Sequence, residues 1–283
     1  MRFLQLAAAL TLSSSLAQAG TLVINTDASD PGPRAAWEDL VDGFRKAHPD
    51  VEVKVNTFDH EGFKTSTRNF LTAQPPDLMT WYAGNRMAPF VAAGLFEDVS
   101  DLWVKEGLAT HLKPALAALT INGKQWGLPY TYYPWGIYYR KDLFAQQGIA
   151  VPANWKEFLA ACAKLKAAGI TPIAIGSKAL WPTAGWFDYL NLRVNGHSFH
   201  MALTQGSVPY TDVRVQAVFE RWDELVRPGY FLANHAAIDW QDAVPAFVRG
   251  QAAMYLMGNF ALDLMRKGGL KDTQIGFMAF PKI

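Results

Sequence analysis

The chain has 283 residues, of which 50% are hydrophobic and 13% aromatic, and this is enough apolar material for one large or two medium domains. Its formal net charge is +1, from 26 basic and 25 acidic residues, and it contains no run of five or more basic residues. This balance argues against nucleic acid and anionic membrane surfaces as partners.

The first residues have the three-part pattern of an export signal. Arg2 supplies a positive start, residues 4–12 form a short apolar stretch, and Ala17-Gln18-Ala19 is a small-x-small cleavage site. A buried or membrane-spanning helix is the alternative, but the stretch is far short of the roughly 20 apolar residues that a span needs. No Cys follows the cleavage site, so the usual lipid attachment point of bacterial lipoproteins is missing. We therefore predict a signal peptide over residues 1–19, cleaved after Ala19, and a soluble periplasmic protein.

Strand and helix patterns alternate in the first part of the mature chain. Residues 21–26 read as a strand, and Asp30-Pro31-Gly32-Pro33 then starts a helix with apolar residues at the i, i+3, i+4, i+7 spacing. A strand over 51–55, a helix over 62–72 and a short strand over 77–80 follow. This order predicts an α/β fold with a mainly parallel sheet.

The second part repeats this style. We expect strands over 136–139, 171–175, 252–257 and 276–280, and helices over 215–226 and 239–249. Another helix begins at Asn154, with Glu157 placed for a capping box and Gly169 at its end. Cys162 is the one cysteine and lies on the apolar face of that helix, so it is interpreted as a core thiol.

An aromatic, proline-rich segment, Leu128-Pro129-Tyr130-Thr131-Tyr132-Tyr133-Pro134-Trp135, separates the two parts. It has no helical period. An ordinary edge strand is one interpretation. The other is an extended crossover between two lobes, with rings facing a ligand.

The chain lacks the signatures of common catalytic sites. No phosphate loop, dinucleotide-binding glycine motif or nucleophile elbow is present. His197 and His200 are three residues apart, but no further ligands in a metal-site pattern accompany them. Asp239 and Asp242 flank Trp240 and could serve glycoside hydrolysis, although capping of a helix explains them better.

Several large rings are not explained by helix faces. Trp81 follows a predicted strand, Trp181 and Trp186 fall in a predicted loop with Asp188 close behind, and Phe260 follows Asn259 at a strand-to-helix junction. Flat rings suit the C–H faces of a sugar, and short polar side chains suit its hydroxyls. This pattern favours a carbohydrate ligand, although a peptide or core packing would use similar residues.

From about Trp37 to its end, the chain resembles the carbohydrate class of extracellular solute-binding proteins, the family that includes maltose-binding receptors. The resemblance depends on the order and spacing of several stretches, each weak alone. They are FRKAHPDV at 44–51, PPDL at 75–78, AGLFED at 93–98, NGKQWGLP at 122–129, YYRKDLF at 138–144, NWKEF at 154–158 and FVRGQAAM at 247–254.

The resemblance implies a two-lobe α/β fold of the periplasmic-binding-protein type (type II-like) that closes over a sugar. Lobe I would begin with residues 20–130, and lobe II would cover 131–283 with a hinge at its start. The implied function is the substrate-binding receptor of an ABC-type sugar importer, which delivers a mono- or oligosaccharide to a membrane permease. The alternatives are a secreted glycoside hydrolase or lyase, and a lectin.

The expected ligand contacts come from the resemblance together with the aromatic pattern. They are Arg34, Trp81, Asn85, Tyr132, Tyr133, Trp181, Trp186, Asp188, Asn259 and Phe260. We expect no catalytic residue, metal or cofactor, no nucleic acid partner, and a monomer. Members of the family run well past Ile283, so we also expect the chain to be C-terminally incomplete, without the segment that returns to lobe I.

Overall fold

The computed structural model describes residues 20–283, so the predicted signal peptide lies outside the described residues. Its contacts divide the chain after Thr80 into two compact units, which we call the N-terminal unit and the C-terminal unit. The lobe boundary expected at residue 130 stays a prediction. Within the C-terminal unit, however, one apolar cluster draws only on residues 81–126, and the others draw only on residues 135–280.

The N-terminal unit contains a small parallel sheet in the order β2-β1-β3. In chain order its elements are β1 (Thr21–Thr26), α1 (Pro31–Ala47), β2 (Glu52–Thr57), α2 (His60–Ala73) and β3 (Leu78–Met79). Ile24, Val41 and Val53 form its buried core. Leu40 belongs to the apolar pattern of α1 but is 60% exposed. The predicted elements of this unit are otherwise confirmed within a few residues.

Short helices and a hairpin open the C-terminal unit, where the sequence predicted no elements. They are η1 (Gly84–Arg86), α3 (Ala88–Ala92), α4 (Ser100–Lys105), α5 (Leu108–His111), α6 (Lys113–Leu119), β4 (Thr120–Ile121) and β5 (Lys124–Gln125). Trp103 is buried at their centre and donates its indole N–H to the carbonyl of Gly127 at 2.9 Å.

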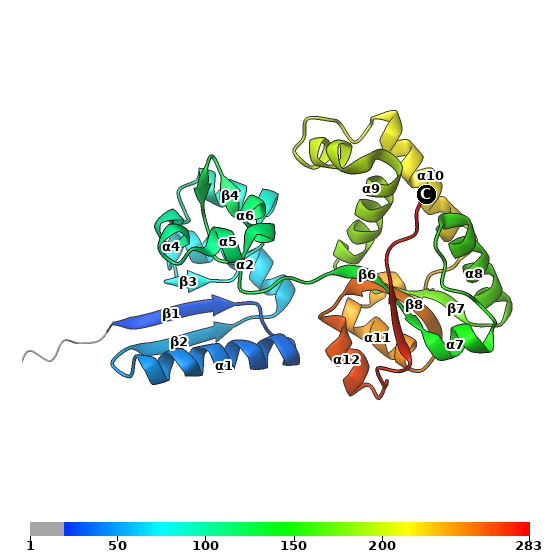
Figure 1. Ribbon diagram of the computed structural model, residues 1–283, viewed down its shortest axis with the longest axis horizontal. Coiled ribbons are helices and arrows are strands. Elements are labelled where there is room, and N and C mark those ends of the chain that lie inside the picture. Colours follow the sequence, from blue (N-terminus) through cyan, green and yellow to red (C-terminus); the bar gives the residue numbers. More distant parts are fainter. Residues whose placement is uncertain (1–19) are drawn as a thin grey trace, which may run out of the picture. The chain divides into compact units, whose positions relative to one another are not determined.

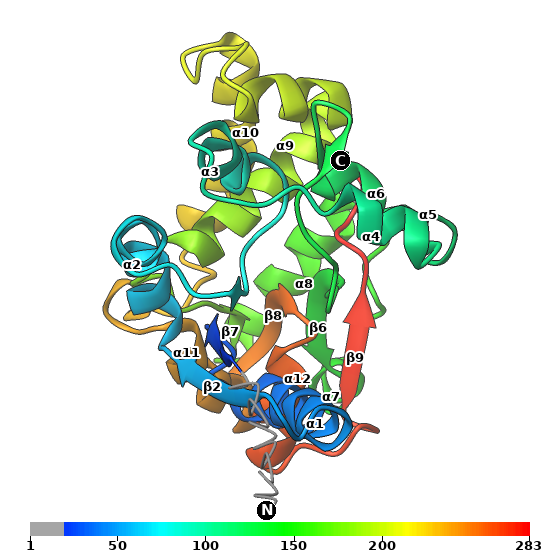
Figure 2. The same ribbon diagram turned by 90° about the vertical axis from the view of Figure 1, so that its left-hand side faces the viewer.

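A four-stranded sheet in the order β7-β8-β6-β9 organises the rest. Figure 2 shows β9 at its edge beside β6. The strands and helices after residue 134 are β6 (Trp135–Arg140), α7 (Lys141–Gln146), α8 (Trp155–Ala167), β7 (Thr171–Ala174), α9 (Trp181–Thr204), α10 (Val213–Val226), η2 (His235–Ala237), α11 (Trp240–Val248), β8 (Ala252–Gly258), α12 (Ala261–Lys267) and β9 (Ile275–Met278).

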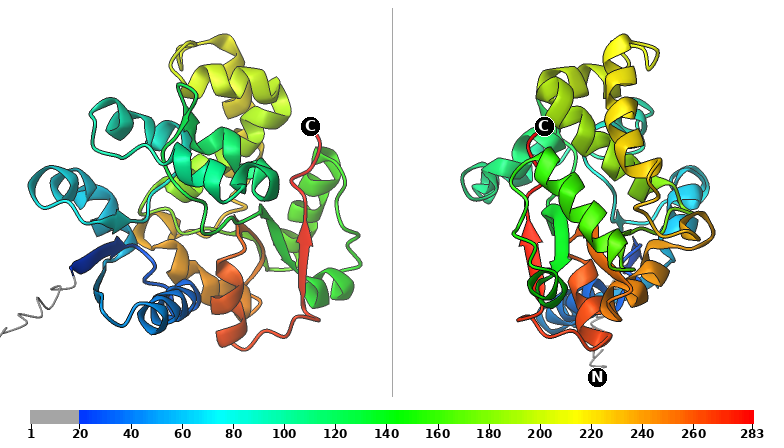
Figure 3. Two further views of the ribbon diagram at one scale, coloured as in Figure 1. Left: turned by 60° about the vertical axis from the view of Figure 1, so that its left-hand side comes forward. Right: turned by 90° about the vertical axis from the view of Figure 1, so that its right-hand side faces the viewer.

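Helices cover both faces of this sheet. Helices α8, α9 and α10 lie on one side of the sheet, and α11 and α12 lie on the other (Figures 1 and 3). Their apolar side chains pack into two separate buried clusters. All seven residues of β8 are therefore buried, which explains why its sequence is a continuous apolar run. Cys162 is buried on α8 as expected, and burial raises the pKa of its thiol.

Two sequence expectations fail in this unit. The sheet is mixed, because β6 pairs antiparallel with both β8 and β9 and only β7 with β8 is parallel. The residues around Trp181 and Trp186 form the start of α9 and not a loop. Pro182 lies in the first turn of α9, where its missing N–H is tolerated, so the proline that suggested a loop in fact starts a helix.

Candidate functional site

Five aromatic rings meet at one end of the strands of the four-stranded sheet. We call this group the aromatic cluster, and its members are Tyr133, Trp135, Trp181, Trp240 and Phe260. Ring centroids lie 5.9 Å apart for Trp135 and Trp181, 6.1 Å for Trp135 and Phe260, and 5.1 Å for Trp240 and Phe260. Tyr133 meets Phe260 at 5.3 Å. All these pairs are edge-on, the arrangement that ring quadrupoles favour.

The topology explains why these rings converge. Trp181 and Trp240 are the first residues of α9 and α11, and Phe260 is the N-cap of α12. Helix α9 follows β7 and helix α12 follows β8. Because β7 and β8 are parallel neighbours, both helices begin at the same end of the sheet. Ligands of open α/β sheets bind outside the carboxyl ends of strands. The aromatic cluster therefore occupies the position where this architecture places a ligand.

The members of the aromatic cluster differ in how much of each residue is exposed to solvent. Trp240 is only 4% exposed and forms its base, whereas Tyr133 is 42% exposed. Trp135, Trp181 and Phe260 lie between these limits. The indole N–H of Trp181 is buried and has no hydrogen-bond acceptor within residues 20–283. The cluster thus combines a buried base with partly exposed rings, and such rings suit the apolar C–H faces of a sugar.

The structure brings together three of the ten predicted ligand residues, namely Tyr133, Trp181 and Phe260. Trp186 lies elsewhere: it is 1% exposed, and its ring packs against Phe231 at 5.4 Å and Phe280 at 5.6 Å. Its neighbours place Trp186 in the core of the C-terminal unit, and we leave it out of the proposed site. Tyr132 adjoins the aromatic cluster in sequence and is 88% exposed.

The other predicted contacts lie on several different elements. Arg34 lies on α1 and pairs with Glu38 at 2.9 Å. The indole of Trp81 donates to the carbonyl of Arg86 at 3.1 Å, and Asn85 is exposed in η1. Asn259 lines a separate shallow cavity of about 340 Å³ with Tyr138, Arg266 and Phe277. None of the interactions described for these side chains joins them to the aromatic cluster.

Asp188 lies half-buried on α9, and burial raises the pKa of its carboxyl group, while the nearby His200 acts in the opposite direction. An acid with a raised pKa binds more protons in the folded state, so its contribution to stability falls as the pH rises above 3.8. We expect Asp188→Asn to raise the melting temperature near pH 7 and to change it less near pH 4. Equal shifts at both pH values would contradict this assignment, and Asp50→Asn at an exposed site is the control.

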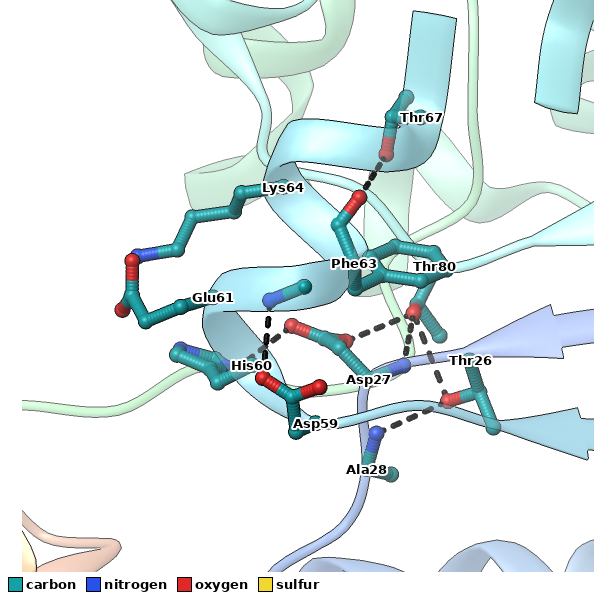
Figure 4. A network of polar contacts seen from close by, with 11 residues as sticks. Thr26, Asp27, Ala28, Asp59, His60, Glu61, Phe63, Lys64, Thr67 and Thr80 are labelled. Atoms are coloured by element: carbon teal, nitrogen blue, oxygen red, sulfur yellow. Dashed lines mark hydrogen bonds and ion pairs between the residues drawn. The ribbon is translucent and has the colours of Figure 1, made fainter. Parts of the chain in front are cut away.

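A polar network in the N-terminal unit was missed by the sequence analysis (Figure 4). Asp27 follows β1, His60 begins α2 directly after β2, and Thr80 follows β3, so the network lies where the three parallel strands end. Asp27 Oδ2 lies 3.0 Å from His60 Nδ1, and Thr80 donates its hydroxyl to Asp27 Oδ1 at 2.8 Å. The signal was a polar residue at or shortly after the end of each predicted strand.

The network holds Asp27 as a carboxylate. Its side chain is only 12% exposed, and burial by itself would raise its pKa. The hydrogen bonds from His60 and Thr80 outweigh this effect, so the pKa of Asp27 lies below its usual value. A fixed carboxylate can accept hydrogen bonds from a polar ligand, and the imidazole beside it can donate or accept one.

The structure also bears on the alternative chemistries. Asp239 and Asp242 form a capping box at the start of α11, as predicted, and Asp239 is paired with Lys178 at 2.9 Å.

His200 contacts the amide of Asn191 at 3.2 Å. Among residues 20–283, no three His, Cys, Asp or Glu side chains gather in a way that could hold a metal ion. Within the same residues, no helix has the length and hydropathy of a membrane span.

Comparison with known families gives one match over most of the chain. The sequence pattern described as bacterial extracellular solute-binding protein matches residues 28–283. The multiple sugar-binding protein of Streptococcus mutans is 26% identical over 254 residues, which are 87% of this chain and 59% of that protein. An ABC transporter extracellular-binding protein of Pyrococcus horikoshii is 27% identical and covers 88% of this chain and 58% of its own length. The chain thus spans a little more than half the length of these relatives.

Solved structures give the same picture. The bacterial solute receptor AcbH, described as having an exclusive preference for β-D-galactopyranose, has a TM-score of 0.83 and 33% identity, over 93% of this chain and 66% of that receptor. A chitin oligosaccharide binding protein has a TM-score of 0.82 and 26% identity, over 93% of this chain and 67% of that protein. Both are described as receptors or binding proteins.

Proposed function

The chain belongs to the bacterial extracellular solute-binding proteins, and from this premise we propose that it is the substrate-binding receptor of an ABC-type sugar importer. The observation that carries the proposal is the aromatic cluster at the carboxyl ends of β7 and β8. Its partly exposed rings suit the C–H faces of a pyranose. The preference of AcbH for β-D-galactopyranose and the ligand of the chitin oligosaccharide binding protein support the same ligand class.

We also propose that the Asp27 network can contact a sugar within the N-terminal unit. An ionised carboxylate accepts strong hydrogen bonds from hydroxyl groups, and His60 and Thr80 fix the direction of its oxygens. Binding then needs little reorganisation of these side chains, which favours affinity.

Asp27→Asn tests this assignment. The amide keeps the shape but loses the charge, so we expect sugar affinity to fall by on the order of tenfold or more, since hydrogen bonds to charged groups contribute about 1.5–3 kcal/mol. Titration calorimetry measures the change. Asp50→Asn, at an exposed position of the same unit, should leave affinity unaltered. Unchanged affinity in the Asp27 variant would show that the network does not contact the sugar.

A binding protein and an enzyme predict different fates for the sugar. We propose that the protein releases its ligand unaltered, because Asp239 and Asp242 are engaged at the start of α11 and are placed to stabilise that helix. Incubation with oligosaccharides followed by chromatography distinguishes the two. Products that form with the wild type and vanish on Asp242→Asn would establish a glycoside hydrolase or lyase instead.

The location and partners follow from the same premise. We propose cleavage after Ala19, a periplasmic monomer and delivery of sugar to a permease in the inner membrane. The relatives are described as extracellular or periplasmic binding proteins, which supports this location. The intact mass of protein recovered from the periplasm tests the cleavage site, and a retained Met1 would refute it.

A further inference from the structure

Two glycines lie against the ring of Trp135. Gly258 is the last residue of β8 and stands directly opposite Trp135 in the antiparallel pairing with β6. Gly185 lies in the second turn of α9. A Cβ atom on Gly185 would lie 2.9 Å from Cζ3 of Trp135, and one on Gly258 would lie 3.0 Å from its Nε1 and would collide with the ring of Phe260. Contacts this short require the ring to move.

The backbone does not require glycine at either position. Neither Gly185 nor Gly258 has a positive φ, so any residue could adopt their conformations. Glycine inside a helix is also less favourable than alanine. By contrast, Gly43 within α1 has open space around the position of a Cβ. The need for glycine at 185 and 258 is therefore steric, and it comes from the neighbouring rings.

Further contacts hold both the backbone and the ring of Trp135. The Tyr189 hydroxyl donates to the carbonyl oxygen of Trp135 at 2.6 Å, which ties the start of β6 to α9. Trp181 and Phe260 meet the ring edge-on. Helix α9 thus restricts movement of the indole ring on one side, and the end of β8 restricts it on another. The neighbouring rings of the aromatic cluster restrict how far it can tilt.

We propose that Gly185 and Gly258 are positioning residues, because the absence of their side chains allows the observed position of the Trp135 ring. We further propose that this ring position determines which sugars the aromatic cluster accepts. The proposal rests on the sugar-binding function proposed above. Binding groups must be held to within about 0.5 Å to discriminate between ligands. Sugars that differ in one axial or equatorial hydroxyl present different faces to a ring, so displacement of Trp135 changes their relative affinities.

The test uses Gly185→Ala with D-galactose and D-glucose, which differ only in the orientation of the C4 hydroxyl. We expect the ratio of the two affinities to change by about tenfold, within the range that one methyl-sized change in a pocket produces. In a Trp135→Phe background the shorter side chain no longer reaches the added methyl group, so Gly185→Ala should change the ratio by no more than about twofold. Gly43→Ala is the matched control and should have no effect.

A second readout is independent of sugar. The Trp135 and Trp181 rings lie close enough for their transitions to couple, so Gly185→Ala should alter the near-ultraviolet circular dichroism of the free protein, and should do so only while Trp135 is present. An unchanged spectrum together with an unchanged affinity ratio, or equal effects with and without Trp135, would overturn the inference. If the wild type bound neither sugar while the spectral coupling appeared, the proposed effect on the choice between galactose and glucose would fail and the positioning of Trp135 would stand.

Discussion

Replacing Trp186 by alanine is expected to lower the free energy of unfolding by about 3–5 kcal/mol, the usual cost of deleting a buried tryptophan side chain. The ring is 1% exposed and contacts Phe231 and Phe280, so its removal leaves a cavity that rigid neighbours cannot fill. Chemical denaturation followed by fluorescence measures the loss.

Two controls make this result specific. Tyr132→Ala, at a position that is 88% exposed, should change stability by less than about 0.5 kcal/mol. Sugar affinity of the folded Trp186→Ala protein should match that of the wild type. If the variant were as stable as the wild type but had lost sugar affinity, Trp186 would be a ligand contact, as the sequence suggested.

Phe260→Leu is expected to produce the opposite result. Leucine keeps much of the apolar volume beside Trp240, so stability should fall by no more than about 1.5 kcal/mol. The flat ring face is lost, and sugar affinity should fall by about 1–3 kcal/mol, by analogy with the stacking of bases on aromatic side chains. Titration calorimetry of the two proteins measures this difference.

Phe277→Leu is the matched control for that change. Phe277 lies in β9 of the same unit, is 50% exposed, and is not a member of the aromatic cluster. Its replacement should leave sugar affinity unaltered. If the two variants lost affinity equally, or if Phe260→Leu had no effect on binding, the aromatic cluster would not be the sugar-stacking surface.

Long or strongly patterned elements were predictable from the sequence. The all-apolar run of β8 and the capped helix α8 appear in the structure where expected, because burial on both faces and a polar cap leave direct marks on the sequence. Asn154 accepts the Glu157 N–H at 3.0 Å, as its spacing indicated. The helices α3 to α6 were missed because segments of four to seven residues are too short to show a helical period.

The candidate site was only partly predictable. The sequence indicated Trp181 in a predicted loop and Phe260 at a strand-to-helix junction, but their contact with Trp135 depends on the pairing of Trp135 with Gly258 across 123 residues of chain. Asp27, His60 and Thr80 were missed because only the register of the parallel sheet brings these residues together. Local sequence shows which residues end each strand, but it does not show which strand ends are neighbours.

A ligand-induced melting shift with a panel of mono- and disaccharides tests the central claim most directly. A ligand at 100 times its Kd stabilises the folded state by about 2.7 kcal/mol, which corresponds to several degrees for a protein of this size. We predict that at least one sugar raises the melting temperature of the wild type and that the same sugar has a smaller effect on Phe260→Leu. A panel in which no sugar raised the melting temperature, while a peptide or a polyamine did, would contradict the assignment of a carbohydrate ligand.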